Sequence, residues 1–204
     1  MVTARYKLGF AYVLSPLARW LSRAGVPPSA ITLMGLALIF GSCVFVIRTG
    51  RVLAFCGLVA ASGLFDVLDG AVARMSGRVT KFGAYLDAVC DRYAEAAVVV
   101  SVAIVTGYWI VSTVVLVGAF MTSYAKARAA METPISNTEW PDLLERGERC
   151  LIYGVGLAGS QLIPCRPGGR DLYWWTLVLL AWLTHVTVVQ RVLRARRFIR
   201  TRKA

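Results

Sequence analysis

Four aspartates stand in the stretch 66–91, DVLDGAVARMSGRVTKFGAYLDAVCD, at spacings that suit joint chemistry. Asp66 and Asp69 are spaced i, i+3 and Asp87 and Asp91 are spaced i, i+4, so each pair shares a face if its segment is helical. Residues 52–65 carry no charge, and the chain turns apolar again soon after Asp91. Carboxylates within sequence this apolar are costly to bury in a membrane, which makes them candidates for a functional site.

These acids would need positive charge around them. Two antiparallel helices joined by a short loop are neighbours, so their acidic faces would meet in one pocket. Four carboxylates cannot share a partly buried pocket without compensation, and two divalent cations would supply it. Oxygen ligands without His or Cys favour Mg²⁺, Mn²⁺ or Ca²⁺ over Zn²⁺. Such a site can activate a nucleophile and stabilise a phosphoryl transition state, so the pattern predicts metal-assisted phosphoryl transfer.

Further residues in the same stretch suit a phosphorylated ligand. Gly70 and Gly83 remove side chains at the edge of the expected pocket, so a flat or bulky ligand can approach the backbone. Arg74 follows Gly70 by one helical turn and is placed to meet a phosphate. The alternative is that Arg74, Lys81 and Arg92 form structural salt bridges with the acids, which would leave the one-faced spacing of the acids unexplained.

The elements that carry these acids have the composition of membrane-spanning helices. Of the 204 residues, 57% are hydrophobic and 17% are charged, a balance that does not suit a soluble domain of this size. We expect six spans, at about residues 30–47, 52–73, 82–106, 108–130, 149–163 and 172–192. The predicted fold class is an all-α integral membrane bundle of six transmembrane helices, with the acids on the second and third.

Basic segments flank this bundle at both ends. Residues 1–27 mix apolar and basic side chains, interrupted at Pro16, and predict an amphipathic helix lying in the membrane interface. A disordered basic leader is the alternative. Residues 28–193 form the expected transmembrane catalytic domain. Residues 194–204 form a basic tail, expected to be cytoplasmic and to bind anionic lipid headgroups.

The distribution of the net charge of +12 indicates which way the bundle faces. Six spans put both termini on one side of the membrane, and most Lys and Arg residues fall on that side. Those expected on the other side are Arg48, Arg51, Arg166 and Arg170. By the positive-inside rule, both termini and the acidic stretch face the cytoplasm of a multi-pass cell-membrane protein. Because the basic residues cluster between apolar runs, the charge does not indicate nucleic-acid binding.

The acidic stretch also resembles a family signature. Its pattern D-x2-D-G-x2-A-R-x8-G-x3-D-x3-D, over residues 66–91, is similar at every defined position to the signature of the CDP-alcohol phosphotransferases. Pro28, Thr32 and Gly35 resemble the family's motif at the start of the first span, where Ser29 replaces the Asn often found. The resemblance covers the whole chain, since that family also has six transmembrane helices and a basic interfacial helix before them.

The resemblance implies roles for these residues. A CDP-linked lipid, either CDP-diacylglycerol or an ether-lipid analogue, would place its diphosphate on two Mg²⁺ or Mn²⁺ ions. The implied lipid-binding residues are Thr32, Gly70, Ala73, Arg74 and Gly83. The implied metal ligands are Asp66, Asp69, Asp87 and Asp91. Asp91 is also the implied general base for an acceptor hydroxyl, which attacks the lipid-side phosphorus and releases CMP.

A second, basic cluster is a candidate for binding the acceptor. Lys126, Arg128, Arg146 and Arg149 flank the polar loop 131–147 on the expected cytoplasmic side. Two or three of them could converge on a phosphate, and Arg suits bidentate contact. The arrangement is similar to that of the family's phosphatidylinositol-phosphate synthases and their archaeal ether-lipid counterparts, which implies inositol 1-phosphate as the acceptor.

This basic cluster also fits different acceptors and a purely structural role. Glycerol 3-phosphate, free inositol and serine are alternative acceptors. The cluster could also consist only of positive-inside charges and helix-end pairs, with Glu145 and Arg149 at i, i+4 as one such pair.

Three features elsewhere are explained more simply by structure than by catalysis. The segment 154–159 matches GxGxxG, but no strand precedes it, and close helix packing explains it better than dinucleotide binding. His185 is expected to hydrogen-bond between helices. Glu95 is expected to pair with Arg92, the alternative being support of Asp91.

Two rival functions are disfavoured by the sequence. A small transporter or cation channel needs polar groups through the full membrane depth, whereas the acids here gather in one half. A catalytically inactive scaffold is disfavoured because every signature position is kept. The glycine-rich spans favour a homodimer.

Overall fold

A computed structural model of the chain describes residues 14–132, 144–163 and 165–201, and every regular element in these ranges is a helix. The all-α prediction is thereby confirmed for the described residues. Residues 1–13 of the predicted interfacial segment, 133–143 of the predicted polar loop and 202–204 of the predicted tail lie outside them. The chain divides into two compact units, Met1–Thr106 and Gly107–Ala204.

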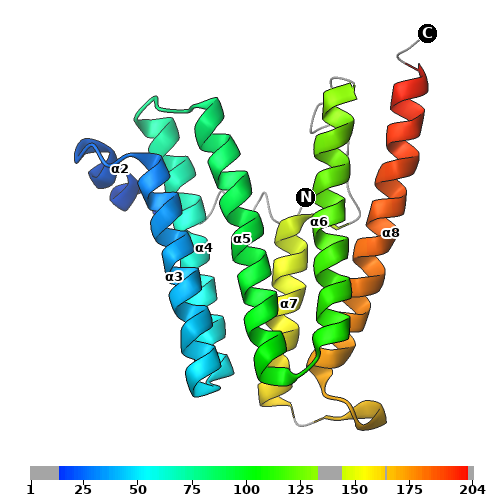
Figure 1. Ribbon diagram of the computed structural model, residues 1–204. Helices are drawn as coiled ribbons and strands as arrows, with labels where there is room; N and C mark the ends of the chain where they lie inside the picture. The colour runs from blue at the N-terminus through cyan, green and yellow to red at the C-terminus, as the bar shows by residue number, and fades with distance from the viewer. Residues whose placement is uncertain (1–13, 133–143, 164, 202–204) are drawn as a thin grey trace. The chain divides into compact units, whose positions relative to one another are not determined.

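The first unit contains α2 (Ser15–Arg23), α3 (Pro28–Thr49), α4 (Val52–Met75) and α5 (Lys81–Thr106), shown in Figure 1. Its helix ends follow from local chemistry. Helix α3 begins with a proline in its first turn, where a missing N–H is harmless, and ends at Gly50, which adopts φ +65°. The hydroxyl of Thr80 accepts a hydrogen bond of 3.0 Å from the Gly83 N–H and so caps the start of α5.

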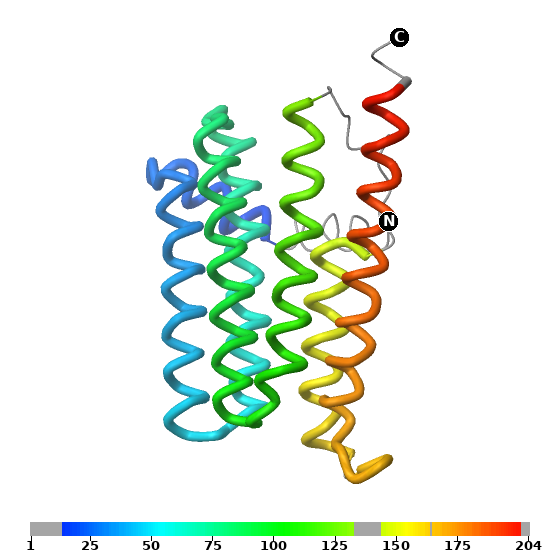
Figure 2. Tube along the Cα trace, turned by 45° about the vertical axis from the view of Figure 1, so that its right-hand side comes forward, coloured from blue at the N-terminus to red at the C-terminus, as the bar shows by residue number. Residues whose placement is uncertain are grey.

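Helix α3 is the common support of the two acid-bearing helices. It packs along both α4 and α5, and each of these packs more extensively against α3 than against the other (Figures 1 and 2). Helix α3 approaches α4 closely at Gly35, where an added Cβ would lie 2.9 Å from the Cβ of Phe65. A larger residue at this position would therefore separate the two helices.

Helix α2 packs on α4 through a small apolar core. The buried members of this core are Ala18, Ile31, Leu68, Ala71 and Val72. The opposite side of α2 exposes Leu17 and Trp20, with fractional exposures of 44% and 65%. The core fixes α2 beside the acid-bearing part of α4.

The second unit contains α6 (Trp109–Glu132), α7 (Arg146–Leu162), the short 3₁₀ helix η1 (Pro167–Gly169) and α8 (Leu172–Thr201). Helix α8 packs against both α6 and α7. Glycines permit both contacts, because a Cβ at Gly118 would collide with Thr184 and a Cβ at Gly156 would collide with Thr176. Close helix packing thus explains Gly156 in the glycine pattern 154–159, as the sequence predicted, but not Gly154, where an added Cβ meets no atom within 4 Å.

The connection between α7 and α8 is held by aromatic and charged side chains. Tyr108 donates a hydrogen bond of 3.1 Å to Asp171, which also accepts one of 2.8 Å from the Trp174 N–H and so caps α8. Tyr173 donates to the hydroxyl of Tyr153 at 2.6 Å, and both rings are buried. These bonds satisfy the polar atoms of side chains that would otherwise be costly to bury.

Among the described residues, four helices are long and apolar enough to cross a membrane. They are Pro28–Thr49, Val52–Met75, Trp109–Glu132 and Leu172–Arg200. The other two predicted spans differ for identifiable reasons. Asp91, Arg92 and Glu95 make α5 too charged for this group, and α7 has 17 residues. Helix α8 also continues to Thr201, beyond the predicted end at about 192, so the basic residues that follow the span continue the helix.

Candidate functional site

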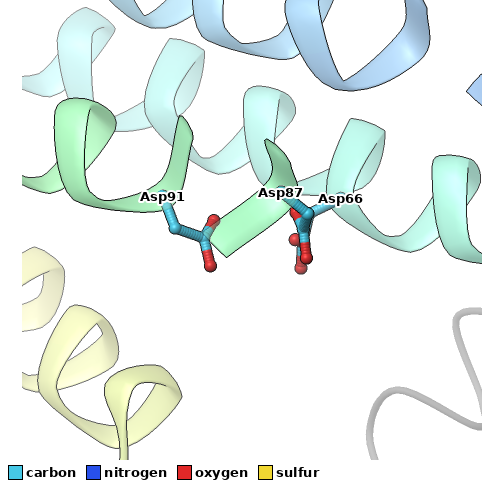
Figure 3. Close-up of side chains that lie close together, drawn as sticks. All are labelled: Asp66, Asp87 and Asp91. Carbon is cyan, nitrogen blue, oxygen red and sulfur yellow. The ribbon is translucent and has the colours of Figure 1, made fainter. Parts of the chain in front are cut away.

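Three of the four predicted acids come together in the first unit. Asp66 on α4 and Asp87 and Asp91 on α5 each offer a carboxylate oxygen within 4.8 Å of the others. Figure 3 shows the three side chains extending from the helix backbones to a common side, with Asp66 and Asp87 adjacent. All three residues are half-buried. The i, i+4 spacing on α5 therefore does what the sequence predicted and places Asp87 and Asp91 on one face.

Asp69 has different surroundings from the other acids. It is buried, with 7% of its surface exposed, and does not belong to the group of oxygens within 4.8 Å among the described residues. Its Oδ2 accepts a hydrogen bond of 2.5 Å from the hydroxyl of Thr32 on α3. Helix α3 thus holds the fourth acid, a contact that the spacing of the aspartates does not reveal.

The acid cluster has the donor chemistry of a site for a hard divalent cation. Oxygens on opposite sides of one ion bound at about 2.1 to 2.4 Å lie roughly 4.2 to 4.8 Å apart. One oxygen from each of the three carboxylates lies within 4.8 Å of the others, so the three are close enough to bind the same ion. Half-buried carboxylates this close repel one another, and a divalent ion would offset the repulsion. Mg²⁺ and Mn²⁺ suit such an all-oxygen set.

The glycines of the signature are surrounded by groups from their own helices. A Cβ at Gly70 would lie 3.4 Å from the Nη1 of Arg74, so the exposed guanidinium folds back over this glycine. A Cβ at Gly83 would lie 3.1 Å from the Thr80 hydroxyl that caps α5. Ala73 is half-buried on α4. At these three positions, therefore, no side chain larger than a methyl group extends from the backbones of α4 and α5.

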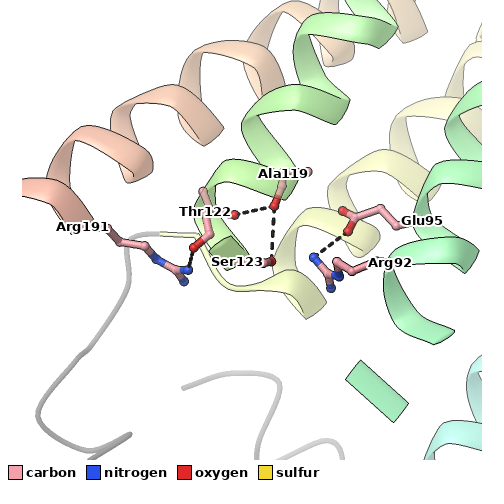
Figure 4. Close-up of polar contacts among 6 residues, drawn as sticks. All are labelled: Arg92, Glu95, Ala119, Thr122, Ser123 and Arg191. Carbon is pink, nitrogen blue, oxygen red and sulfur yellow. Dashed lines mark hydrogen bonds and ion pairs between the residues drawn. The ribbon is translucent and has the colours of Figure 1, made fainter. Parts of the chain in front are cut away.

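Glu95 pairs with Arg92, as the sequence predicted. Their side chains approach to 3.0 Å, with exposures of 7% and 24% respectively (Figure 4). The pair compensates two charges within the apolar part of α5.

The second unit contains a basic pocket of about 340 Å³. Its lining residues are Thr122, Ser123, Lys126 and Ala127 from α6, Arg146 and Arg149 from α7, and Arg191 from α8. Arg149 and Arg191 are 4% and 7% exposed, and an Nη1–H of Arg191 donates to the backbone carbonyl of Thr122 (Figure 4). Four cations around one cavity create a strong preference for an anion.

The composition of this pocket differs from the sequence expectation at two positions. Arg128 does not line it, being 51% exposed and paired with Glu132 at 2.6 Å. Arg191 lines it although this residue, at the end of the predicted span 172–192, was assigned no role from the sequence. The signal that could have found Arg191 is its position at the end of the last apolar span, ahead of the arginines of the tail.

Two polar side chains in the second unit have their partners on their own helix. Glu145 forms a capping box with Glu148, whose Oε2 accepts from the Glu145 N–H at 3.2 Å, a role that the sequence did not assign to it. His185 was expected to bond between helices, but its Nδ1 lies 2.9 Å from the carbonyl oxygen of Ala181 in the same helix. A helical side chain can reach the carbonyl one turn earlier in its own helix, so this partner needs no second helix.

Comparison with known proteins identifies the class of site. The family model described as CDP-alcohol phosphatidyltransferase matches residues 26–189, which include Thr32 and all four aspartates. The chain belongs to the CDP-alcohol phosphatidyltransferase family. Its members are transferases, and the resemblance of the acidic stretch to the family signature is confirmed.

Relatives of this chain come from both bacteria and archaea. The phosphatidylinositol phosphate synthase of Mycobacterium tuberculosis is 32% identical over 91% of this chain and 87% of its own length. The archaetidylinositol phosphate synthase of Pyrococcus horikoshii is 33% identical over 90% of this chain and 91% of its own length.

Solved structures of the mycobacterial relative also match. Its crystal structure with CDP-DAG bound superposes with a TM-score of 0.79 at 30% identity, covering 90% of this chain and 94% of the other. Its complex with manganese and citrate gives a TM-score of 0.76 at 32% identity, covering 88% and 87% of the two chains.

Proposed function

We propose that this chain transfers a phosphatidyl-type group from a CDP-linked lipid to the hydroxyl of inositol 1-phosphate and releases CMP. The observation that carries this proposal is the convergence of Asp66, Asp87 and Asp91 in a member of this family. Inositol phosphate as acceptor is supported by the relatives, which are phosphatidylinositol phosphate and archaetidylinositol phosphate synthases. The basic pocket of the second unit adds a place for its phosphate.

The metal centre of this proposal uses all four aspartates. Asp66, Asp69, Asp87 and Asp91 would hold two divalent ions, Mg²⁺ or Mn²⁺. The manganese complex of the mycobacterial relative supports this choice of metal. When bound, the ions supply positive charge against the diphosphate and the developing phosphoryl charge.

The chemical step is one displacement at phosphorus. Asp91 accepts the proton of the acceptor hydroxyl, whose oxygen forms a bond to the phosphorus that carries the lipid. The bond from that phosphorus to the bridging oxygen breaks, and CMP leaves with the bonding electrons. Asp91 is suited to this role because it follows Asp87 by one turn on α5 and so borders the apolar part of that helix.

The donor site in this proposal lies along the small residues of α4 and α5. Gly70, Ala73 and Gly83 leave the backbone accessible to the cytidine. Arg74, exposed and folded over Gly70, can swing onto a phosphate of the donor. The CDP-DAG complex of the mycobacterial relative supports a CDP-linked lipid as donor.

The acceptor's phosphate would occupy the basic pocket. Lys126, Arg146, Arg149 and Arg191 supply its cations, and the two buried arginines offer donors held in a fixed direction. Arg128, which the sequence also suggested, is left out of this proposal because its side chain pairs with Glu132. Glycerol 3-phosphate carries the same phosphate, so contacts to the cyclohexane ring of inositol must distinguish the two acceptors.

The proposed membrane arrangement keeps six spans. Helix α5, with 26 residues, is about 39 Å long, and α7, with 17 residues, is about 25 Å long, at the lower limit for a span. Helix α2, with apolar Leu17 and Trp20 exposed beside arginines, would lie in the interface. Residues 1–27, 28–193 and 194–204 would then be interfacial segment, catalytic domain and basic tail, with both termini and the site in the cytoplasm.

Two kinds of partner belong to the same proposal. The basic end of α8 would bind anionic headgroups through Arg194, Arg196, Arg197 and Arg200. A second copy of the chain would pack against open glycines such as Gly41 and Gly57 on α3 and α4, where an added Cβ meets no atom within 4 Å.

Release of CMP from CDP-diacylglycerol by the purified protein tests the reaction. With Mg²⁺ or Mn²⁺ we expect CMP release with inositol 1-phosphate to exceed that with glycerol 3-phosphate, free inositol or serine. A chelator should abolish the reaction, and added Mn²⁺ should restore it. The reaction class is contradicted if no acceptor yields CMP, and the metal centre is contradicted if the chelator has no effect.

The variant Asp91→Asn separates the base from the metal ligands. We expect CMP release to fall by at least roughly 100-fold while metal-dependent binding of the CDP-lipid persists, because the amide cannot accept the proton. Glu132→Gln, an equivalent change at an exposed acid, should retain full activity. An equal loss of lipid binding and of rate in Asp91→Asn would make Asp91 chiefly a ligand.

A further inference from the structure

The hydroxyl of Thr32 links α3 to the acidic stretch. Its Oγ1 lies 2.5 Å from Oδ2 of Asp69 and 3.2 Å from the carbonyl oxygen of Pro28 in its own helix. A hydroxyl has one hydrogen, and the shorter distance to a carboxylate marks Asp69 as its acceptor. Asp69 is 7% exposed, so this bond compensates a buried carboxylate.

We propose that Thr32 is a positioning residue, which fixes the Asp69 carboxylate for a divalent ion by occupying one of its oxygens. This inference rests on the proposed metal centre. A carboxylate rotates about its last bond, and a hydrogen bond to Oδ2 removes that freedom and leaves Oδ1 for coordination. Residues that support metal ligands in this way typically change metal affinity about 10- to 100-fold when removed.

The packing of α3 on α4 makes this contact possible. Gly35 lies one turn after Thr32, and Phe65 lies one turn before Asp69. A Cβ at Gly35 would be 2.9 Å from the Cβ of Phe65. Because α3 and α4 are antiparallel, the Gly35–Phe65 and Thr32–Asp69 contacts lie one turn apart in the same interface. The glycine brings α3 close enough to α4 for a side chain as short as threonine to reach Asp69.

This position gives Thr32 a different role from the one that the sequence implied. The resemblance placed it among the CDP-lipid-binding residues, whereas its hydroxyl contacts a carboxylate. A lipid contact would affect the KM for the CDP-lipid. A positioning residue should instead affect the metal concentration needed for activity, with kcat and the KM for lipid largely restored at saturating Mn²⁺.

Binding of Mn²⁺ to the purified protein in lipid nanodiscs tests the proposal, with free Mn²⁺ measured by electron paramagnetic resonance. We expect Thr32→Val to weaken Mn²⁺ binding roughly 10-fold or more. Thr32→Ser keeps the hydroxyl and should bind nearly as tightly as the wild type. The matched control is Thr49→Val at the far end of α3, where the hydroxyl donates to the carbonyl of Phe45 at 2.8 Å, and an unchanged affinity is expected.

A second variant covers the case in which Thr32→Val does not fold. Gly35→Ala keeps the Thr32 hydroxyl but pushes α3 away from Phe65, so it should also weaken Mn²⁺ binding. Wild-type affinity in a folded Thr32→Val protein, or an equal loss in Thr32→Ser, would overturn the positioning role. If the wild type itself binds no Mn²⁺, or Asp87→Asn binds it as tightly as the wild type, the proposed metal centre fails together with this inference.

Discussion

Arg128 and Arg191 carry the same charge but lie in different surroundings. Arg128 is half-exposed and paired with Glu132, whereas Arg191 is 7% exposed, lines the basic pocket and donates to the carbonyl of Thr122. An exposed ion pair contributes little to binding because water screens it. A buried guanidinium held by a backbone carbonyl is already oriented, so it can bind an anion without first losing conformational freedom.

This contrast predicts that the two arginines differ in their effect on the acceptor. Arg191→Gln should raise the KM for inositol 1-phosphate roughly 10-fold or more, since hydrogen bonds to charged groups contribute about 1.5 to 3 kcal/mol. The matched change Arg128→Gln should leave that KM unaltered. Steady-state kinetics with inositol 1-phosphate as the varied substrate measure both.

A further substitution tests the same pocket in case Arg191→Gln does not fold. Lys126 is half-buried in the same pocket, so Lys126→Gln should raise the same KM with less disturbance of the core. An increase for Arg128→Gln equal to that for Arg191→Gln would contradict the assignment of the acceptor site.

The residue contacts that the sequence could predict are those set by local spacing. The i, i+4 separation of Asp87 and Asp91 determines that they share a face of α5, and the pairing of Arg92 with Glu95 follows from i, i+3. The Thr32–Asp69 bond could not be predicted in the same way, because it depends on the register between α3 and α4. Periodicity within one segment carries no information about that register.

Helix α7 shows how an element is shaped by its neighbour. Gly154 and Gly156 are both in its middle, yet a Cβ at Gly154 would meet nothing within 4 Å and a Cβ at Gly156 would collide with the side chain of Thr176 on α8. One glycine therefore permits helix packing and the other does not contribute to it. A sequence pattern alone assigns them the same role.

The two glycines should respond oppositely to alanine. Gly154→Ala should leave stability unchanged or raise it by up to about 1 kcal/mol, the helix-propensity gain. Gly156→Ala should lower stability by about 1 to 3 kcal/mol despite that gain, because overpacking separates α7 from α8. Thermal unfolding of the two purified variants in one detergent gives the comparison, and equal melting temperatures would count against a close contact between α7 and α8 at Gly156.

The limits of the helices were predictable to different degrees. Proline and glycine mark the ends of α3, so its predicted core, residues 30–47, lies within the observed Pro28–Thr49. The predicted end of α8, at about residue 192, falls too early because a change from apolar to basic residues does not end a helix. Arginine is a good helix former, and the helix continues to Thr201 although the apolar run stops.

At the scale of the whole molecule, the proposed function requires a particular side of the membrane. Inositol phosphate is charged and soluble, and the acids and the basic pocket must both face the compartment that supplies it. Under the positive-inside rule, the one lysine and three arginines of the pocket would lie on the cytoplasmic side, while Arg166 and Arg170, in the connection between α7 and α8, are among the few basic residues expected on the other side. The orientation thus depends on whether α7 crosses the membrane.

Two natural cysteines near the ends of α7 make this orientation testable. Cys150 lies in the second turn of α7 and Cys165 lies beyond its end, and both are exposed. In variants that keep one of them and replace the other four cysteines by serine or alanine, a membrane-impermeant maleimide should label Cys165 in intact cells. It should label Cys150 only after the membrane is opened. Labelling of both from outside would show that α7 does not cross, and the reverse pattern would place the acceptor pocket on the outer side, where the proposed reaction could not draw on cytoplasmic inositol phosphate.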